Sequence, residues 1–569
     1  MPRCRFIAAL VAGGMLWVAS AGLTVSAQES PTLQLVASNQ TAQLIWPASA
    51  YYFLLQSKFN LTSTNAWVNE ACASPSVASF SRYFQEGAAV LATNVTTNGL
   101  SFSQTNPPIP KFYRLKTPDW LPLCSFAIFF DGQMEFSQCA TMIVNGMVHA
   151  NGSIYVGTTA SLTFNSSVSC TGMVSAPLID GQFLGLSGWT PNNPSTWNVT
   201  FNGNPAVISN MPAFPLWSFT NGNHAVIDVP PVGENPNTVP GVERLYNQAQ
   251  MVLMITNDVS GSGNPTVQLA LLQSIYGQVP GADPAPLILR YTNASPALLN
   301  TNLPFLSLTN MFLDQRERKT NLVTQIDVGL FANWTSTNTT VQSKLPFSAG
   351  HFPTIFYVAD RRNHQTYQLP VVRLMDGAQL PANNNLGFSV ATPNPLYVLG
   401  NYNVQTAASA VNASAGTTNT AYTVPAALFC DAITVLSPHW TDAGSYLAYA
   451  QQSQFQAVDD TINAAIFAGN MPTTDNTGTG FSGGVHNFPR LLENWTGIYL
   501  WLNTSLCRLW TSQMATNQFR NPMTFNPAPV NPYYNPPTRQ FSFDRNFLNP
   551  SKIPPGVPML VFGTNAPFQ

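Results

Sequence analysis

The densest cluster of residues able to do chemistry lies in the C-terminal third of the chain, within residues 483–495. His486 and Glu493 could act there as base and acid, with Trp495 as an aromatic platform for a sugar. The same stretch fits a structural role, in which a helical turn pairs Arg490 with Glu493 three residues on and Trp495 packs beneath. The sequence favours the structural role. His486, Arg490, Glu493 and Trp495 are therefore a candidate polar site without an assigned catalytic residue.

The sequence lacks the recognisable motifs of catalysis and cofactor binding. Its six histidines form no H-x-H or H-E-x-x-H pair, so it predicts no zinc site. Gly261-Ser262-Gly263 lacks the third glycine and the lysine of a phosphate-binding loop. We therefore expect no cofactor. Carboxylates distant in sequence can still meet in space, so an acid pair that cleaves glycosides stays open.

Two short charge runs could bind an anion. The run from Asp314 to Lys319 is the only dense one, and Asp360-Arg361-Arg362 follows a strand expected at Ile355–Val358. Such runs more often form solvated turns with internal pairs. The sequence favours that interpretation and predicts a hairpin tip at Asp360–Arg362.

The composition of the chain is unusual, and it indicates which secondary-structure elements position these residues. Charged residues are only 8% of the 569, and polarity comes from Asn, Thr, Ser and Gln, which suit turns, strand faces and stacked ladders. Hydrophobic residues reach 45%, enough for several cores. The net charge is −2 without a long basic run, which argues against a nucleic-acid partner.

Residues 1–27 are typical of a secretory signal peptide. Arg3 and Arg5 precede an apolar stretch, and Val25-Ser26-Ala27 offers small residues at a cleavage site. An uncleaved anchor is the alternative. No later segment has about 20 uninterrupted apolar residues, so we expect no transmembrane segment after cleavage. The expected location is extracellular, periplasmic or on the cell surface.

An exported protein reaches an oxidising environment, in which disulfide bonds can form. Six cysteines follow the signal sequence, and a local bridge within the segment that holds three of them is favoured, with buried thiols as the alternative. These cysteines are Cys72, Cys124, Cys139, Cys170, Cys430 and Cys507.

Residues 31–117 have the alternation and short turns of a small β-sandwich. Leu44 and Trp46 share one face of a strand, and Phe112-Tyr113-Arg114-Leu115 closes the segment. The Leu-x-Trp-Pro strand and this closing strand resemble the fibronectin-III-like domains of exported bacterial proteins. The resemblance implies a fibronectin-III-like module at the N-terminus.

Residues 119–239 consist of very short apolar strands separated by Asn and Gly. This pattern is typical of a parallel β-solenoid, in which apolar residues fill the coil and Asn-Gly pairs turn its corners, although the period is irregular and a meander or jelly roll would use similar residues. The pattern returns at residues 385–519, which we interpret as further coils of the same stack. Between them, 240–384 predicts an α+β insertion that interrupts the solenoid, with a helix from Thr324 to Trp334. Residues 520–569 predict a Pro/Asn-rich tail that wraps a surface without regular structure.

From about residue 125 onward the chain resembles a family of large exported bacterial proteins without established activity, distantly similar to pilus-associated β-solenoid proteins. The family implies no catalytic residue. The stretches that carry the resemblance are 146–152, 327–329, 394–398, 493–495, 544–548 and 554–556.

Together these observations predict a mainly β protein: a fibronectin-III-like sandwich followed by a β-solenoid with an α+β insertion. The function expected is that of an exported, non-enzymatic structural or adhesive protein that binds glycans or matrix weakly and at many points. A carbohydrate-active enzyme, such as a β-helical lyase or hydrolase, and a pilus-associated assembly protein are the alternatives, because fold alone does not decide function.

Overall fold

A computed structural model describes strands β1–β9 between residues 34 and 116 and most of residues 120–561. Side chains are described from residue 121 onward. The gaps after that point are residues 138, 158–159, 176–197, 204–205, 215, 218, 237, 258–262, 272–286, 345–351, 382–385, 407–412, 448–454, 474–483, 518 and 520–532. The predicted signal peptide and Cys72 lie outside the described residues.

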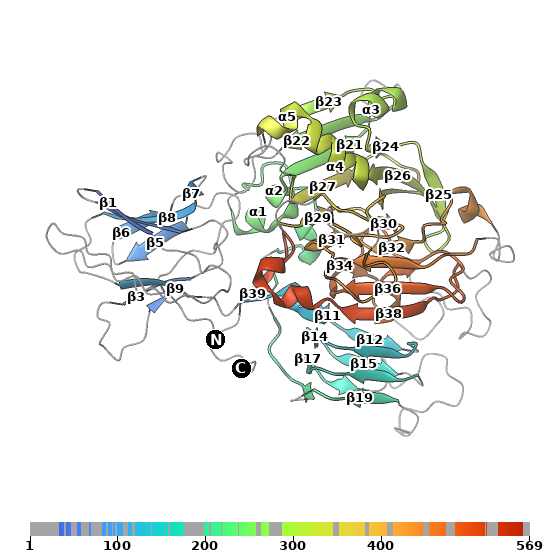
Figure 1. The fold of residues 1–569 in the computed structure, drawn as a ribbon, viewed down its shortest axis with the longest axis horizontal. Helices are drawn as coiled ribbons and strands as arrows, with labels where there is room; N and C mark the ends of the chain where they lie inside the picture. Colours follow the sequence, from blue (N-terminus) through green and yellow to red (C-terminus); the bar gives the residue numbers. More distant parts are fainter. Residues whose placement is uncertain are drawn as a thin grey trace.

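The structure is mainly β, as predicted from the sequence. Its N-terminal strands form antiparallel sheets at the left of Figure 1, apart from the larger sheets. One sheet has the order β1-β2-β8-β7 and another the order β4-β3-β9, with β5 and β6 as a separate pair. Their bounds are β1 Gln34–Ser38, β2 Thr41–Trp46, β3 Leu54–Lys58, β4 Val68–Asn69, β5 Arg82–Glu86, β6 Ala89–Thr93, β7 Val95–Thr96, β8 Gly99–Thr105 and β9 Phe112–Lys116.

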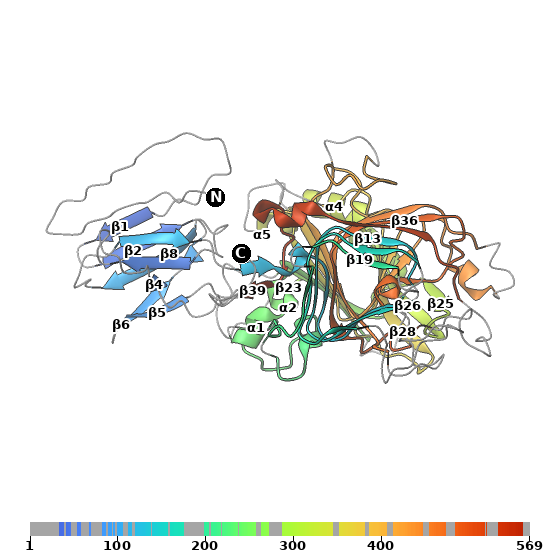
Figure 2. The same ribbon diagram turned by 90° about the horizontal axis from the view of Figure 1, so that it is seen from below.

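After β10 (Trp120–Pro122) and a 3-10 turn, the chain winds in successive turns that each add one strand to each of three parallel sheets. The winding is visible from below in Figure 2. The first sheet takes β11 Phe126–Phe130, β14 Met147–Ala150, β17 Val168–Cys170 and β20 Val207–Ile208. The second takes β12 Met134–Ser137, β15 Ile154–Gly157 and β18 Val174–Ser175. The third takes β13 Met142–Val144, β16 Leu162–Phe164 and β19 Val199–Phe201.

These first turns repeat every 20 residues. Ile128, Val148 and Val168 are direct partners in adjacent parallel strands, and Asn145 and Asn165 hydrogen-bond at the same separation. The corners repeat as well, because a Cβ built on Gly152 would lie 2.6 Å from the backbone of Gly132. A regular period therefore underlies a sequence in which none is apparent.

The chain then returns along the stack and starts a second series of turns at the opposite end (Figure 1). The return carries 3-10 turn η4 (Asn223–Val226), α1 (Val239–Glu243) and α2 (Leu245–Gln248). In the first sheet the second series supplies β21 Met251–Thr256, β22 Thr266–Leu271, β23 Leu287–Tyr291, β27 Ile355–Asp360, β29 Phe388–Ala391, β31 Ala426–Cys430, β34 Ala465–Asn470 and β37 Leu506–Thr511. A seven-stranded sheet takes β24 Leu306–Ser307, β25 Met311–Asp314, β26 Lys319–Asp327, β28 Gln368–Met375, β30 Leu396–Leu399, β32 Ile433–Leu436 and β35 Arg490–Leu491. A three-stranded sheet takes β33 Asp460–Asn463, β36 Tyr499–Thr504 and β38 Thr538–Phe543.

The two series meet where the last turn pairs with the first. Strand β37 runs parallel to β11, with Phe129 opposite Cys507, so strands from both series belong to one 12-stranded sheet. Ser505 donates a hydrogen bond of 2.6 Å to the carbonyl of Phe126, and Arg508 donates to the carbonyl of Asp131. Segments almost 400 residues apart in sequence therefore share one continuous sheet.

Residues 240–384 contain α1 to α5 but do not form a separate insertion. Parallel strand β27 pairs with β21 on one side and with β29 on the other, so no break in the sheet falls near residue 385. The prediction of an interruption is corrected, because the strands of this segment are apolar enough to be buried in the same stack. Its remaining helices are α3 Pro296–Asn302, α4 Val328–Thr337 and α5 Thr339–Lys344.

Two local predictions also need correction. The helix predicted from Thr324 to Trp334 begins later, because Thr324 lies inside strand β26 and α4 starts only at Val328, where Asp327 caps it by accepting from the N–H of Leu330. The tail is not devoid of regular structure. Strand β38 extends the three-stranded sheet, and β39 (Met559–Val561) pairs antiparallel with β10. The alternating Thr-Arg-Gln-Phe-Ser-Phe sequence explains β38, since its phenylalanines face the interior.

A continuous hydrophobic core fills the inside of the stack, and a smaller one lies on the outer side of the seven-stranded sheet. The smaller core includes Phe312, Tyr397 and Trp440. Among the described residues, no helix is long and apolar enough to cross a membrane.

The cysteines of the described chain are all buried. Cys124 and Cys170 are unbridged thiols, so the predicted local disulfide is wrong, because every pairing among the three cysteines of that segment needs one of these two. Burial raises the pKa of the Cys124 thiol well above its usual range. The alternative of buried thiols holds for Cys124, Cys170, Cys430 and Cys507.

Candidate functional site

The structure separates the four residues of the predicted polar site. The backbone around Arg490 is extended in strand β35, so alternate side chains point to opposite faces. Leu491 belongs to the interior core and Leu492 to the outer one. Arg490 therefore faces outward and Glu493 inward, and the predicted helical ion pair between them is wrong.

Arg490 forms a buried ion pair with Glu317, whose position is 173 residues away. Its guanidinium also donates 2.6 Å to the carbonyl of Ala515. Asp314 accepts from the N–H groups of Arg316 and Glu317 and from the hydroxyl of Tyr397 at 2.5 Å. The charge run 314–319 was predicted as a solvated turn, but Asp314, Arg316 and Glu317 are all buried. These three charged residues are used inside the protein, whereas Arg318 of the same run is exposed.

Glu493 lies inside the stack with Trp495. Its carboxylate accepts two hydrogen bonds of 2.6 Å from the N–H and hydroxyl of Ser437. Burial raises the pKa of Glu493 to about 7, although these hydrogen bonds oppose the shift. Burial also raises the pKa of nearby Asp460 well above its usual range. Both carboxyl groups are fully buried, so this pair cannot reach a polymeric substrate.

His486 is half-buried, and among the described residues it forms no hydrogen bond or ion pair with Arg490, Glu493 or Trp495. Its Nε2 lies 3.2 Å from the side chain of Asn487. Burial, together with the nearby guanidinium of Arg539, lowers the pKa of His486 to about 3. The ring is therefore neutral and serves poorly as a base. The four predicted residues share no reaction centre.

A histidine that sequence reasoning missed sits between two carboxylates. His224 Nδ1 lies 2.9 Å from Asp228, and Nε2 lies 3.1 Å from Asp431. Burial alone would lower the pKa of His224, but the two carboxylates raise it to about 9. Asp431 also accepts from three successive backbone N–H groups at residues 513–515. The imidazolium therefore fastens the return segment to the sheet.

A second buried histidine lies in the first turns of the stack. His149 packs against Phe129 and Phe214, with ring centroids 5.4 and 4.2 Å away. Its Nδ1 lies 2.9 Å from the hydroxyl of Ser169 and its Nε2 3.2 Å from Asn151. Burial lowers the pKa of His149 to about 4. Ser169 and His149 resemble half of a hydrolytic triad, but both are fully buried in the core.

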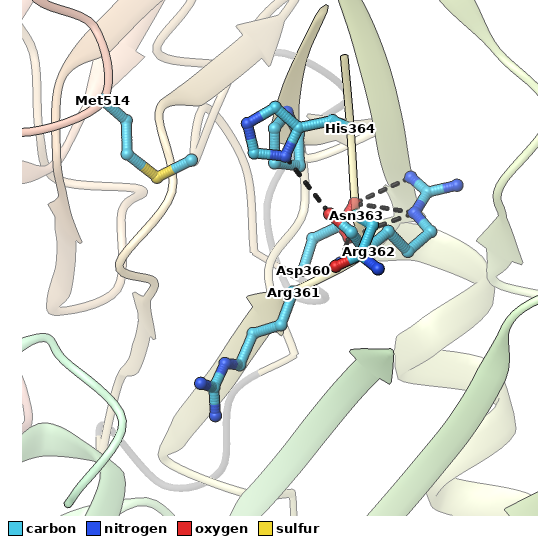
Figure 3. Close-up of a pocket in the computed structure, with 7 residues that line it drawn as sticks. Asp360, Arg361, Arg362, Asn363, His364 and Met514 are labelled. Carbon is cyan, nitrogen blue, oxygen red and sulfur yellow. Dashed lines mark hydrogen bonds and ion pairs between the residues drawn. The ribbon is translucent and has the colours of Figure 1, made fainter. Parts of the chain in front are cut away.

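An open recess lies where β27 turns into β28 (Figure 3). It encloses about 420 Å³ and is lined by Asp360, Arg361, Arg362, Asn363, His364, Pro370 and Met514. Arg361 and His364 are exposed, and Met514 approaches from the loop after β37. The prediction of a hairpin tip at Asp360–Arg362 is wrong, because β27 and β28 belong to different sheets and do not pair with each other. The segment is a corner between two sheets, and it borders the recess.

Hydrogen bonds to buried Asp360 fix the turn that forms this recess. The buried carboxylate of Asp360 accepts from Arg362 Nη2 at 2.7 Å and from the hydroxyl of Thr324 at 2.8 Å. Asn394 receives the N–H of Asp360 at 2.9 Å and donates to its carbonyl at 2.9 Å. The positive charge of Arg362 is thus neutralised by Asp360. The charge of Arg361 has no such partner, because no described residue forms a hydrogen bond or ion pair with its guanidinium.

Exposed aromatic side chains lie on the outer face of the sheet β33-β36-β38, which we call the aromatic face. Residues 416–417 cover another part of this outer face, where the Gly416 N–H donates to Thr461 and Asn503 donates to the carbonyl of Thr417. In β36, Leu500 and Leu502 enter the core, so Tyr499 and Trp501 point outward. Tyr499 is 43% exposed and Trp501 half-buried, and their rings stack with centroids 6.3 Å apart and an interplanar angle of 29°. The side chains beside them on β38 are Thr538 and Gln540.

Neutral residues continue the aromatic face along the stack. Strand β38 lies against β13, and the outward residues of β13, β16 and β19 are Ile143, Thr163 and Thr200, in register. At the ends of these strands, Asn202 donates 2.8 Å to Asn165, which donates 2.8 Å to Asn145. No outward side chain of the described strands β33, β36 and β38 carries a charge, because Asp460 and Arg539 lie on the inward side.

Comparisons with known proteins give no relative. No known family, no curated protein and no solved structure matches the chain. Among the described residues, no group of three His, Cys, Asp or Glu side chains is placed to hold a metal ion.

Proposed function

We propose that the protein is an exported, non-enzymatic structural or adhesive protein that binds polysaccharides through the aromatic face. The observation that carries this proposal is the stacked pair Tyr499 and Trp501, exposed and half-buried, on strands whose outward positions carry no charge. The two faces of a sugar ring present C–H groups, and its rim presents hydroxyls. An aromatic ring packs under the C–H groups, while Thr538 and Gln540 at the same level hydrogen-bond the hydroxyls.

The repeated strands favour a long polymer over a small sugar. Each turn of the stack adds one more outward position to the same face, so a polysaccharide chain can contact several turns at once. Individual contacts on an open surface are weak, but linked contacts raise the overall affinity by mass action. The lack of charge on the outward strand positions suits neutral sugar hydroxyls.

We further propose that the stack is a β-solenoid and that residues 31–117 form a fibronectin-III-like spacer. The chain of parallel pairs from β11 to β20 and from β27 to β37 supports the first assignment. The separate antiparallel sheets of β1–β9 support the second. Residues 1–27 would direct export, which places the aromatic face in contact with extracellular or cell-wall polymers.

A polysaccharide panel tests this function. The secreted protein is incubated with immobilised neutral and acidic polysaccharides, and both retention on the polymer and the release of new reducing ends are measured. We expect retention without new reducing ends. Turnover of any polymer would establish a carbohydrate-active enzyme instead, and failure to retain the protein on every polymer would contradict the proposal. Co-purification with fibres in place of polymer binding would favour a pilus-associated role.

A further inference from the structure

We propose that the recess beside β27 is a subsite for an oxyanion carried by a polysaccharide, such as the carboxylate of a uronic acid or the sulfate of a sulfated sugar. This inference rests on the proposed function and adds charge selectivity to it. The recess differs from the aromatic face because its lining includes the exposed guanidinium of Arg361. Its volume of about 420 Å³ lies within the about 300–1,000 Å³ typical of ligand pockets.

Arg361 is the residue on which the subsite depends. Its guanidinium is exposed and has no hydrogen-bond or ion-pair partner in the described part of the chain, whereas neighbouring Arg362 is paired with Asp360. Asp360 is therefore already neutralised and does not repel an anion. A guanidinium matches two oxygens of a carboxylate or sulfate with parallel hydrogen bonds.

The remaining walls fit the rest of an acidic sugar. His364 Nδ1 lies 3.3 Å from the carbonyl of Arg362, and a carbonyl only accepts, so Nδ1 carries the proton. The guanidinium of Arg361 points away from this ring in Figure 3, so His364 lines a different part of the recess. Asn363 adds an exposed amide, and Pro370 and Met514 supply apolar lining for the sugar ring. Asn363 and Met514 are labelled in Figure 3.

The subsite is preorganised because its exposed groups extend from a fixed turn. The Arg361 N–H donates 2.8 Å to the carbonyl of Ile255, and the Asn363 N–H donates 2.7 Å to the side chain of Asn257. With Asp360 fastened from below, the backbone need not reorganise when an anion binds. Such rigidity lowers the entropy cost of binding.

The test compares polymers that differ only in charge. Polygalacturonate is compared with its methyl ester, and dextran sulfate with dextran, by measuring dissociation constants for the full-length protein. The Arg361→Gln variant is compared with Arg545→Gln, which removes another exposed positive charge elsewhere. We expect at least one acidic polymer to bind about tenfold more tightly than its neutral counterpart, as for a charge-assisted bidentate contact. Arg361→Gln should remove that preference and Arg545→Gln should keep it. The responding polymer identifies carboxylate or sulfate as the anion.

Two results would overturn the subsite. One is equal binding of acidic and neutral polymers by the unmodified protein, which would leave the aromatic face and the proposed function intact. The other is an equal effect of the two arginine variants, which would show only a general charge contribution. Binding to none of the polymers would instead reject the proposed function along with the subsite. Both arginines are exposed, so thermal unfolding of the variants should match that of the unmodified protein.

Discussion

The charged state of His224 gives the sharpest physical prediction. Its folded pKa of about 9 lies above the usual 6.5, because the ring is held between Asp228 and Asp431. A raised histidine pKa stabilises the fold fully below about pH 6.5, and this stabilisation is lost as the pH rises to about 9. The 2.5-unit difference, at about 1.36 kcal/mol per unit, corresponds to about 3 kcal/mol.

The perturbation is His224→Gln, and the assay is urea unfolding of both proteins between pH 6 and 9. We expect the difference in free energy of unfolding between the unmodified protein and the variant to fall by about 3 kcal/mol over this range. The buried carboxyl of Glu493 also titrates near pH 7, but it is present in both proteins and cancels in the difference. A histidine NMR titration, with the His224 signal assigned by its loss in the variant, measures the pKa directly.

A difference in stability that does not change with pH would refute this reasoning. It would show that the ring is neutral in the folded protein and acts only through packing, for example against Trp510, whose ring centroid is 5.9 Å away. An NMR pKa near 6.5 would lead to the same conclusion.

Two further substitutions test the packing of the stack. Glu317→Gln leaves the guanidinium of Arg490 buried without its charge partner, so we expect a loss of about 3–5 kcal/mol in urea unfolding, largely recovered when both residues are replaced by Met. No recovery in the double variant would mean that the ion pair itself is required. Gly152→Ala puts a methyl group 2.6 Å from the backbone of the preceding turn, so we expect destabilisation by about 1–3 kcal/mol, and an unchanged midpoint would contradict the stacked corner.

The sequence was informative where local patterns determine structure. The short apolar strands with Asn and Gly between them predicted a mainly β chain, and the alternation around Leu44 and Trp46 matches strand β2. Asn145 and Asn165 form the side-chain ladder that the Asn-rich composition favours. The 20-residue period is not apparent in the sequence because only a few inward positions per turn need be apolar.

The site could not be predicted because its contacts are not local. Arg490 pairs with Glu317, 173 residues away, and nothing near either residue identifies the other. The proposed helical pairing of Arg490 with Glu493 failed for a related reason, since a short polar segment fits a helical turn and an extended strand equally well. Tyr499 and Trp501 are two residues apart, and in a strand this spacing places both side chains on the same face. The spacing alone could therefore have indicated an aromatic pair.

The aromatic face is the claim on which the functional account depends, and one binding measurement tests it most directly. The affinity of the best-retained polysaccharide is measured for Tyr499→Ala and Trp501→Ala, with Tyr446→Ala as a control at a 54% exposed tyrosine outside this face and outside the recess. We predict a loss of about 1–2 kcal/mol, or roughly 5- to 30-fold, for each variant of the aromatic face and less than twofold for the control. Equal affinities for all three variants, with folding unchanged, would contradict the account.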